Sequence, residues 1–392
     1  MVPAALRSER VRVLINGLHA KSGGGVTYLR NMLPQLADDG RLELHLFLHV
    51  DQYALFHPVD ERVRVHALEF PPRLWNLMLW EQVSLPIIAR VMAADVTFSP
   101  ANYGPLFAPN PVIVLRNALA VAGTERRLGK RLYWLGLALM TFVSLVGCRR
   151  AIAVSEYTRN NLAHAAALRR KVTVVHHGVD PVFRPGAAVA DGPPFLLAVA
   201  DIYVQKNLHT LIEALARVRE QMPEIKLRIA GRRIDDDYFH EIEKSVDRHA
   251  LREHVIFLGE RTADELVTLY RSCAAFVFPS TVETFGNPLA EAMACGAPIV
   301  SSNTAAMPEV VGDAALLFDP LDVADMANRI LQVLRDRALA RSLAERGIAR
   351  ARQFSWERTA QLTADVLVST ARHTMIARTV DGGAISRPSP RG

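Results

Sequence analysis

Short apolar runs rich in β-branched residues recur along most of the chain, and this repetition constrains the fold more than any other feature. The first run begins at Val11 in "VRVLINGLHA" and ends at Gly17. A glycine-rich loop, a helix-like stretch and a second run, "LELHLFLHV", follow it. Strand, loop, helix and strand in this order form the repeating unit of a parallel β-sheet. We therefore predict an α/β fold.

The length of the chain and one change in its composition predict two domains. A chain of 392 residues exceeds the usual size of a single domain. The stretch "DPVFRPGAAVADGPP", which begins at Asp180, is rich in proline and glycine and is typical of a linker. A second series of strand-like runs starts just after it with "FLLAVA".

We expect two Rossmann-like domains that face each other across a cleft, at residues 1–185 and 186–365. The final helix of the second domain could cross back to the first, and residues 366–392 would form a tail that is disordered at its end. Ligands of such sheets bind outside the carboxyl ends of the strands. The cleft between the domains is therefore the expected ligand site.

Composition and charge exclude several classes of protein. Half of the residues are hydrophobic and 22% are charged, which is typical of a globular enzyme. Three distant cysteines, Cys148, Cys273 and Cys295, indicate neither a disulfide framework nor a zinc site. The first residues do not resemble a signal peptide, so we expect a cytoplasmic protein. The first half is mildly basic, which does not by itself indicate a nucleic-acid partner, and we expect none.

One segment, Leu132–Gly147, raises the question of membrane contact. Its sixteen residues are almost uncharged, and arginine and lysine residues lie on both sides of it. A transmembrane helix needs roughly 20 apolar residues, so the segment is too short to span a bilayer. Two alternatives remain: a buried core helix, or a helix that lies on an anionic membrane surface.

The stretch "STVETFGNPLAEAMACGAP", residues 280–298, follows a strand-like run and carries the signals of a short helix. Asn287 is a good N-cap, Pro288 suits the first helical position and Gly296 is a typical helix end. The free N–H groups and the positive dipole at the start of this helix would form an anion site for phosphate.

Two carboxylates, Glu283 and Glu291, lie on either side of this helix start. Glu283 precedes the helix and Glu291 follows about one turn into it, so both could line one pocket. They could instead be a solvated loop residue and a helix-surface residue. Glu291, however, lies among small apolar residues, where an unpaired charge is unfavourable. We therefore expect the pair to bind the sugar and the ribose of a sugar nucleotide.

The residues around these glutamates, "FVFPSTVETFGNPLAEAMACGAPIVSSNTAAMPEVVGDAALLFDP", resemble glycosyltransferase family 4. The signature of this family is a pair of glutamates separated by seven residues. "GERTADELVTLYRSC" before them and, more loosely, "GGGVTYLRN", "LWEQVSLP", "AVSEYTRNNL" and "HHGVDPVFRP" extend the likeness. The resemblance implies a retaining enzyme of GT-B fold with a nucleotide-sugar donor on the second domain. It also implies a saccharide or lipid-linked acceptor on the first domain, and neither metal nor cofactor.

The resemblance assigns roles to particular residues. Glu283 would contact the hydroxyls of the donor sugar, Glu291 would bind the ribose, and Lys206 would neutralise the diphosphate. Further contacts to the sugar or diphosphate are implied for the backbone amides of Phe285, Gly286 and Asn287 and for the loop of Gly24 and Gly25. Lys206 could instead be a surface lysine, and the two glycines a tight turn.

The sequence departs from the family at the end of the first strand of the second domain. Many members carry an arginine there that holds the diphosphate, whereas this chain has Asp201. An anion about 5 Å from a phosphate costs on the order of 1 to 3 kcal/mol. We expect Asp201 either to pair with Lys206 or to turn away. Arg232 or Arg233 would then replace the missing positive charge, unless both are simply solvated.

A second departure lies in the first domain, where many members have His-Asp and this chain has Arg116. Arginine does not act as a general base, but it can bind a phosphate or carboxylate with two hydrogen bonds. We expect Arg116 to take a catalytic role by orienting the acceptor or the leaving diphosphate. His19, His176 and His177 are the other candidates for the usual histidine role.

Together these features predict a retaining hexosyltransferase of cell-surface polysaccharide biosynthesis that acts at the inner face of the membrane. The leaving phosphate oxygen would take the acceptor proton, while the helix dipole and Lys206 stabilise the developing charge. One alternative is a nucleotide-sugar epimerase of the same fold. Another is a catalytically degenerate scaffold that binds nucleotide sugars.

Overall fold

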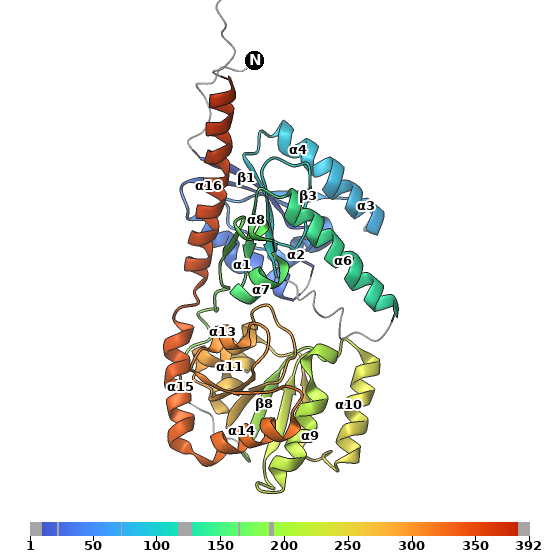
Figure 1. The fold of residues 1–392 in the computed structure, drawn as a ribbon, viewed down its shortest axis with the longest axis vertical. Coiled ribbons are helices and arrows are strands. Elements are labelled where there is room, and N and C mark those ends of the chain that lie inside the picture. Colours follow the sequence, from blue (N-terminus) through green and yellow to red (C-terminus); the bar gives the residue numbers. More distant parts are fainter. Residues whose placement is uncertain are drawn as a thin grey trace, which may run out of the picture.

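The chain folds into two α/β domains, one above the other in Figure 1. The structure is a computed structural model that describes residues 10–21, 23–71, 73–116, 128–163, 165–187 and 192–382. Each domain contains one sheet whose paired strands all run parallel, with helices on its faces. The predicted α/β fold is confirmed.

The sheet of the N-terminal domain has the order β3-β2-β1-β4-β5-β6-β7. Its strands are β1 (Val11–Asn16), β2 (Leu42–His49), β3 (Arg64–Leu68), β4 (Val96–Ser99), β5 (Pro111–Leu115), β6 (Arg150–Ala153) and β7 (Val172–Val174). Strand β1 pairs with β2 on one side and with β4 on the other. The order of the strands therefore reverses between β1 and β4, which makes this the topological switch point of the sheet.

The described helices of this domain lie between its strands, and one long helix, over residues 74–91, contains a π-helical turn. The helices are α1 (Gly24–Ala37), η2 (Val50–Gln52), α2 (Tyr53–Phe56), α3 (Leu74–Leu79), η3 (Trp80–Ser84), α4 (Leu85–Val91), α6 (Leu128–Gly147), α7 (Glu156–Leu162) and α8 (Ala166–Arg169). The π-helical turn η3 joins α3 to α4 without a break. Helix α1 buries residues three and four positions apart, such as Tyr28, Leu29, Met32, Leu33 and Leu36, as expected for an amphipathic helix.

The sheet of the C-terminal domain has the order β10-β9-β8-β11-β12-β13. Its strands are β8 (Phe195–Val199), β9 (Lys226–Ala230), β10 (Val255–Gly259), β11 (Ala275–Phe278), β12 (Ile299–Ser302) and β13 (Ala315–Phe318). The helices are η4 (Val204–Lys206), α9 (Leu208–Arg219), α10 (Asp236–Arg248), α11 (Ala263–Ser272), α12 (Asn287–Cys295), α13 (Met307–Val311), α14 (Val323–Arg335) and α15 (Arg337–Ala351). The switch point of this sheet lies between β8 and β11.

The last helix, α16 (Trp356–Gly382), returns to the N-terminal domain, where it runs beside α1 (Figure 1). Buried residues Ala360, Ala364, Leu367 and Ala371 recur along it at helical spacing. Residues 366–382, expected to belong to a tail, therefore continue helix α16, whereas 383–392 lie outside the described residues.

The two points where the chain passes between the domains lie against each other. The Val179 amide donates to the Phe354 carbonyl at 3.1 Å, and the His177 ring stacks on Trp356 with centroids 5.8 Å apart. A Cβ atom on Gly178 would lie 2.3 Å from the Trp356 nitrogen. Only a residue without a side chain allows the two segments to approach this closely.

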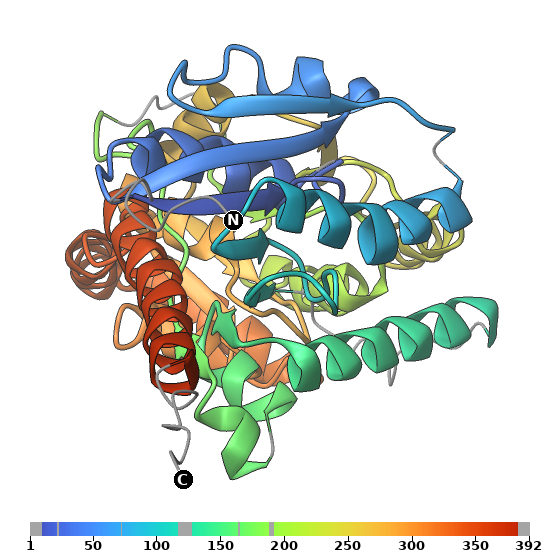
Figure 2. The ribbon, with the colours of Figure 1, turned by 90° about the horizontal axis from the view of Figure 1, so that it is seen from above.

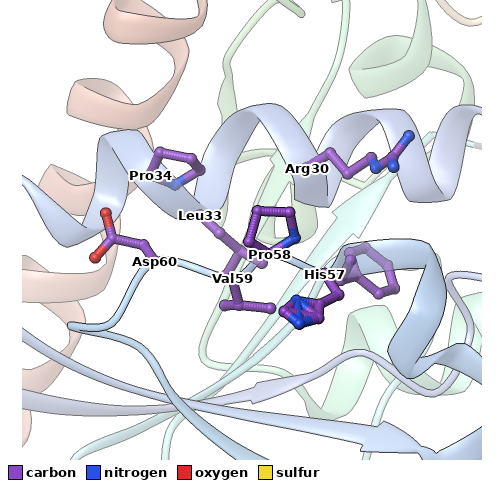
Figure 3. A pocket seen from close by; sticks show the side chains of 8 residues that line it. Arg30, Leu33, Pro34, His57, Pro58, Val59 and Asp60 are labelled. Atoms are coloured by element: carbon purple, nitrogen blue, oxygen red, sulfur yellow. The ribbon is translucent and has the colours of Figure 1, made fainter.

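A pocket on the N-terminal domain lies where the loop after α2 approaches α1 (Figure 3). Its lining residues are Arg30, Leu33, Pro34, Phe56, His57, Pro58, Val59 and Asp60. These helix residues belong to the middle and end of α1, whereas its first residue, Gly24, lies at the carboxyl edge of the sheet. The pocket is therefore separate from the site described below.

Replacing Gly178 with alanine should destabilise the protein, because the new methyl group would collide with backbone atoms of residues 355 and 356. We expect Gly178→Ala to reduce the free energy of unfolding by about 1 to 3 kcal/mol, which a lowered unfolding temperature would report. Gly136→Ala in α6 is the matched control, since its methyl group would meet no atom within 4 Å. Equal unfolding temperatures for both variants would contradict this account.

Candidate functional site

The carboxyl ends of the strands in the two sheets face each other, so residues that follow them meet between the domains. The Thr284 hydroxyl, after β11, donates to the Arg116 carbonyl, after β5, at 2.6 Å. A Cβ atom on Gly23, after β1, would lie 4.0 Å from Nη2 of Arg232, after β9. The predicted site residues of the two domains therefore surround a common region.

Lys206 and Glu283 form an ion pair at the switch point of the C-terminal sheet. Lys206 ends the 3-10 turn η4 after β8, and Glu283 lies in the loop after β11. The Lys206 Nζ atom is 2.6 Å from Glu283 Oε1, and the two side chains are 15% and 14% exposed. Because a carboxylate has lone pairs for several donors, Glu283 can hold Lys206 and still accept a hydrogen bond from a ligand hydroxyl.

Asp201 pairs with Arg232 and not with Lys206, so the first of the two alternatives expected for Asp201 is wrong. Its carboxylate accepts hydrogen bonds from the Arg232 backbone amide at 2.9 Å, Nε at 3.2 Å and Nη2 at 2.8 Å. Burial works against ionisation, but the Arg232 hydrogen bonds hold the pKa of the Asp201 carboxyl below its usual value. The adjacent strands β8 and β9 bring the two residues to the same edge.

The two arginines after β9 point in different directions. Arg233 pairs with Asp236 at 2.6 Å, and its guanidinium lies 4.2 Å from the centre of the Phe239 ring. This geometry turns Arg233 toward helix α10. Arg232 remains at the contact with the glycine loop of the N-terminal domain, as its distance from Gly23 shows.

Helix α12 starts differently from the prediction, because its N-cap is Gly286 and not Asn287. Gly286 has φ +87°, a left-handed conformation that glycine adopts without a steric penalty. Asn287 is the first helical residue, and its Oδ1 atom accepts a hydrogen bond from His177 Nδ1 at 3.0 Å. The side chain that would have capped the helix instead links it to the N-terminal domain.

His177 is a neutral contact residue at the domain interface. Burial lowers its pKa to about 4, so the ring is uncharged at neutral pH. It packs against Phe285 and Trp356 while it holds Asn287. The other histidine of the pair, His176, contacts Glu309 Oε1 at 2.8 Å. Both histidines therefore hold residues of the second domain.

Glu309, which sequence reasoning missed, connects α13 to the N-terminal domain. Its two carboxylate oxygens accept hydrogen bonds from the amides of Glu156 and Tyr157 at 2.8 and 3.0 Å. These amides lie in the first turn of α7, where free N–H groups and the helix dipole favour an anion. The pattern "MPEV" in the sequence gives no signal of this role, because the partner helix is distant along the chain.

Glu291 projects from α12 toward helix α11. The hydroxyl of Tyr270, a buried residue that sequence reasoning also missed, donates to Glu291 Oε2 at 3.1 Å. Burial raises the pKa of the Glu291 carboxyl to about 7, although the Tyr270 hydrogen bond opposes this change. At neutral pH this carboxyl is therefore poised between its charged and uncharged forms.

Arg116 brings together the predicted residues of the N-terminal domain. Its backbone amide donates to Asn102 Oδ1 at 2.8 Å, and its Nη1 atom donates to the Gly24 carbonyl at 3.2 Å. A Cβ atom on Gly25 would lie 2.7 Å from Arg116 Nη2. The glycine loop therefore leaves the space in which the guanidinium lies.

Two negative observations apply to the described part of the chain. It contains no group of three or more histidine, cysteine, aspartate or glutamate residues placed to hold a metal ion. Within the same residues, every helix is too short or too polar to cross a membrane.

Models of two protein families match the chain, one after the other. Residues 22–183 match the model described as glycosyltransferase family 4, and residues 180–350 match the model described as glycosyl transferases group 1. The two matches meet where the chain passes between the sheets. Each domain is therefore similar to a glycosyltransferase family model.

The sequence similarity between this chain and its curated relatives covers part of the chain. The O-antigen chain mannosyltransferase B of Escherichia coli is 37% identical over 165 residues, which cover 42% of each chain. The serotype-specific mannosyltransferase WbdA of Escherichia coli is 35% identical over 169 residues, or 43% of this chain and 21% of that protein. The glycogen synthase of Mycobacterium tuberculosis is 33% identical over 207 residues, or 52% and 49%. The chain thus spans less than half the length of these relatives.

Solved structures resemble nearly the whole chain at low sequence identity. Anabaena HepE in complex with UDP and glucose has a TM-score of 0.73 and 20% identity, covering 92% of this chain and all of that chain. WaaG, a glycosyltransferase involved in lipopolysaccharide biosynthesis, has a TM-score of 0.72 and 14% identity, covering 91% and 99%. The chain therefore has the GT-B fold predicted from its sequence.

The raised pKa of Glu291 predicts a pH-dependent stability. Between pH 4.5 and 7 this carboxyl is ionised in the unfolded chain but still protonated in the folded one, so stability falls as pH rises. Glu291→Gln should remove this loss and raise the free energy of unfolding at pH 8 by about 1 to 3 kcal/mol. Unfolding temperatures measured from pH 5 to 8 test this. Parallel curves for the variant and the wild type would contradict it.

Proposed function

We propose that this chain, both of whose domains match glycosyltransferase models, is a retaining hexosyltransferase of cell-surface polysaccharide biosynthesis. It would move a sugar from a nucleotide-sugar donor to a saccharide or lipid-linked saccharide acceptor. The observation that carries the proposal is the Lys206–Glu283 pair at the switch point, beside the start of α12. The names of its two Escherichia coli relatives favour a mannosyl donor.

On the C-terminal side, the start of α12 supplies the anion site of the donor. The amides of Phe285, Gly286 and Asn287 and the helix dipole would bind the sugar or the diphosphate. Lys206 would neutralise the diphosphate, and Glu283 would accept hydrogen bonds from the sugar hydroxyls. Glu291, deeper in the same helix, would bind the ribose.

On the N-terminal side, the loop of Gly24 and Gly25 would approach the phosphates, with Arg116 against it. Arg116 would orient the leaving diphosphate or the acceptor through its guanidinium. Arg232 would contact the diphosphate with the N–H groups that Asp201 leaves available, since guanidinium has five. Asp201 itself is then neutralised by Arg232 and repels the phosphates less.

The proposed reaction retains the configuration of the sugar through departure and attack on the same face. The bond from the anomeric carbon to the phosphate oxygen breaks while the acceptor oxygen bonds to that carbon. The leaving phosphate oxygen takes the acceptor proton. Glu283 is bound to Lys206, which suits a hydroxyl-binding role better than that of a nucleophile. Lys206 and the dipole of α12 stabilise the developing negative charge, and the proposal includes no metal or cofactor.

Glu283→Gln tests the donor site, because the amide oxygen can still accept from Lys206 while the negative charge is lost. We expect transfer to fall by about a hundredfold or more, with an unfolding temperature close to that of the wild type. The exposed Glu345→Gln on α15 is the control and should behave as the wild type. A fully active Glu283→Gln enzyme would contradict the assignment.

A panel of nucleotide sugars, including GDP-mannose and UDP-glucose, identifies the donor by the rise in unfolding temperature that binding produces. Incubating that donor with and without saccharide acceptors then separates the alternatives. A transferase needs the acceptor, an epimerase changes the donor sugar alone, and a degenerate scaffold changes neither. A panel in which no nucleotide sugar stabilises the protein would count against the proposal.

We also propose that the enzyme binds an anionic membrane peripherally, from the cytoplasmic side. Two helical segments of the N-terminal domain, 74–91 and α6, lie on the same side of that domain in both views (Figures 1 and 2). Each exposes an apolar stripe, which we call the apolar face: Trp75, Leu79, Val83, Ile87 and Val91 on the first, and Leu132, Leu135, Leu139, Phe142 and Val146 on α6. Exposed Arg73, Arg131 and Arg149 flank these stripes and would attract anionic lipids.

The double variant Leu135→Glu/Leu139→Glu tests this contact, because two carboxylates on the apolar face oppose insertion into an anionic surface. We expect wild-type protein to float with phosphatidylglycerol vesicles and the double variant to bind at least tenfold more weakly. Leu321→Glu, at a 76% exposed leucine of the C-terminal domain, should bind as the wild type does. Absence of flotation in the wild type would contradict the proposal.

A further inference from the structure

The switch point of the N-terminal sheet holds a chain of polar side chains that the donor site does not use. It consists of Glu81 in η3, His19 after β1 and Tyr103 after β4. In the C-terminal sheet, the corresponding switch point between β8 and β11 holds Lys206 and Glu283. Since ligands of doubly wound sheets bind at the switch point, the carboxyl ends of β1 and β4 are the place where a second substrate would bind.

The hydrogen bonds among these three side chains all run in one direction, from Tyr103 to His19 and from His19 to Glu81. His19 Nε2 lies 2.7 Å from Glu81 Oε1, which also accepts from Asn16 Nδ2 at 2.8 Å. In the neutral imidazole, the proton that Nε2 donates to the carboxylate leaves a lone pair on Nδ1. The Tyr103 hydroxyl, 3.3 Å from Nδ1, then donates to it. The phenol oxygen keeps its own lone pairs for a further donor.

The position of Glu81 is unusual for a charged residue. Its side chain is 3% exposed, and it lies in the π-helical turn that interrupts the helix from α3 to α4. Burying a carboxylate is costly unless hydrogen bonds compensate, and single π-helical turns occur frequently at functional sites. Here the turn directs Glu81 inward onto Asn16 and His19.

The chain of side chains lies between the proposed donor site and the apolar face. On one side, Asn102, next to Tyr103, holds the Arg116 amide, and Ala20, next to His19, packs against Gly25. On the other side, the Tyr133 phenol of α6 is close enough to contribute to the raised pKa of Tyr103. Burial, with smaller contributions from Glu81 and Tyr133, raises the pKa of the Tyr103 phenol to about 12, so it stays protonated.

We infer that Tyr103, polarised through His19 and Glu81, binds a hydroxyl of the acceptor saccharide. The inference rests on the proposed glycosyltransferase function. A sugar hydroxyl that donates to the Tyr103 oxygen would lie beside Arg116 and the glycine loop, where the transferred sugar arrives. Tyr103 is then a binding residue, and His19 and Glu81 are positioning residues that fix its proton.

Tyr103→Phe tests the inference with little structural change, because the ring contact with His19, whose centroids are 4.6 Å apart, remains. The assay adds labelled nucleotide sugar to membranes that contain the natural acceptor. These membranes come from source cells that lack this gene. We expect the concentration of membranes needed for half-maximal labelling to rise at least tenfold. The donor KM and the donor-induced rise in unfolding temperature should stay unchanged.

Two further variants distinguish binding from a structural role. Glu81→Gln, which removes only the charge, should weaken acceptor use in the same direction but less than Tyr103→Phe. Tyr53→Phe, at the exposed first residue of α2, is the matched control and should label as the wild type does.

Wild-type acceptor use by Tyr103→Phe would overturn the inference while leaving the glycosyltransferase proposal intact. The inference would also fall if Tyr103→Phe lost donor-induced stabilisation, because the residue would then serve the donor site or the fold. A wild-type protein that transfers label from no nucleotide sugar would overturn both.

Discussion

The direction of the parallel strands is the constraint on which the rest of the structure depends. Because all paired strands of a sheet run the same way, their carboxyl ends meet at one edge, and each connection must cross back over a face of the sheet. Two such sheets face each other by these edges. The loops that carry Lys206, Glu283, Arg116 and the glycines at 23–25 therefore meet between the domains, although they are up to 260 positions apart.

The charged side chains between the two domains each have an ion-pair or hydrogen-bond partner. Lys206 is bound to Glu283, Asp201 to Arg232, and Glu309 to the first turn of α7. Partly buried charges require such partners, since removal from water is costly. The same pairs also orient the side chains, so the region between the domains presents fixed donors and acceptors to a ligand.

The fold was largely predictable from the sequence, and the site was predictable in part. Alternating strand and helix patterns indicated both sheets, and the motif around Glu283 and Glu291 indicated helix α12, which carries Glu291. The partner of Asp201, the N-cap at Gly286 and the contact of Asn287 with His177 were not predictable. Local propensity favours asparagine at an N-cap, but a partner from the other domain competed for its side chain.

The sequence by itself determined where strands, turns and helix ends lie, because periodicity, glycine and proline act over a few residues. Gly296 ends α12 as its sequence indicates, with a left-handed φ of +79°. Only the tertiary structure decided which charged groups meet, because their partners lie on neighbouring strands or in the other domain. Asp201 is 31 residues from Arg232, and Asn16 is 65 residues from Glu81. No local pattern encodes these contacts, since they form only when both sheets and the returning helix α16 are packed.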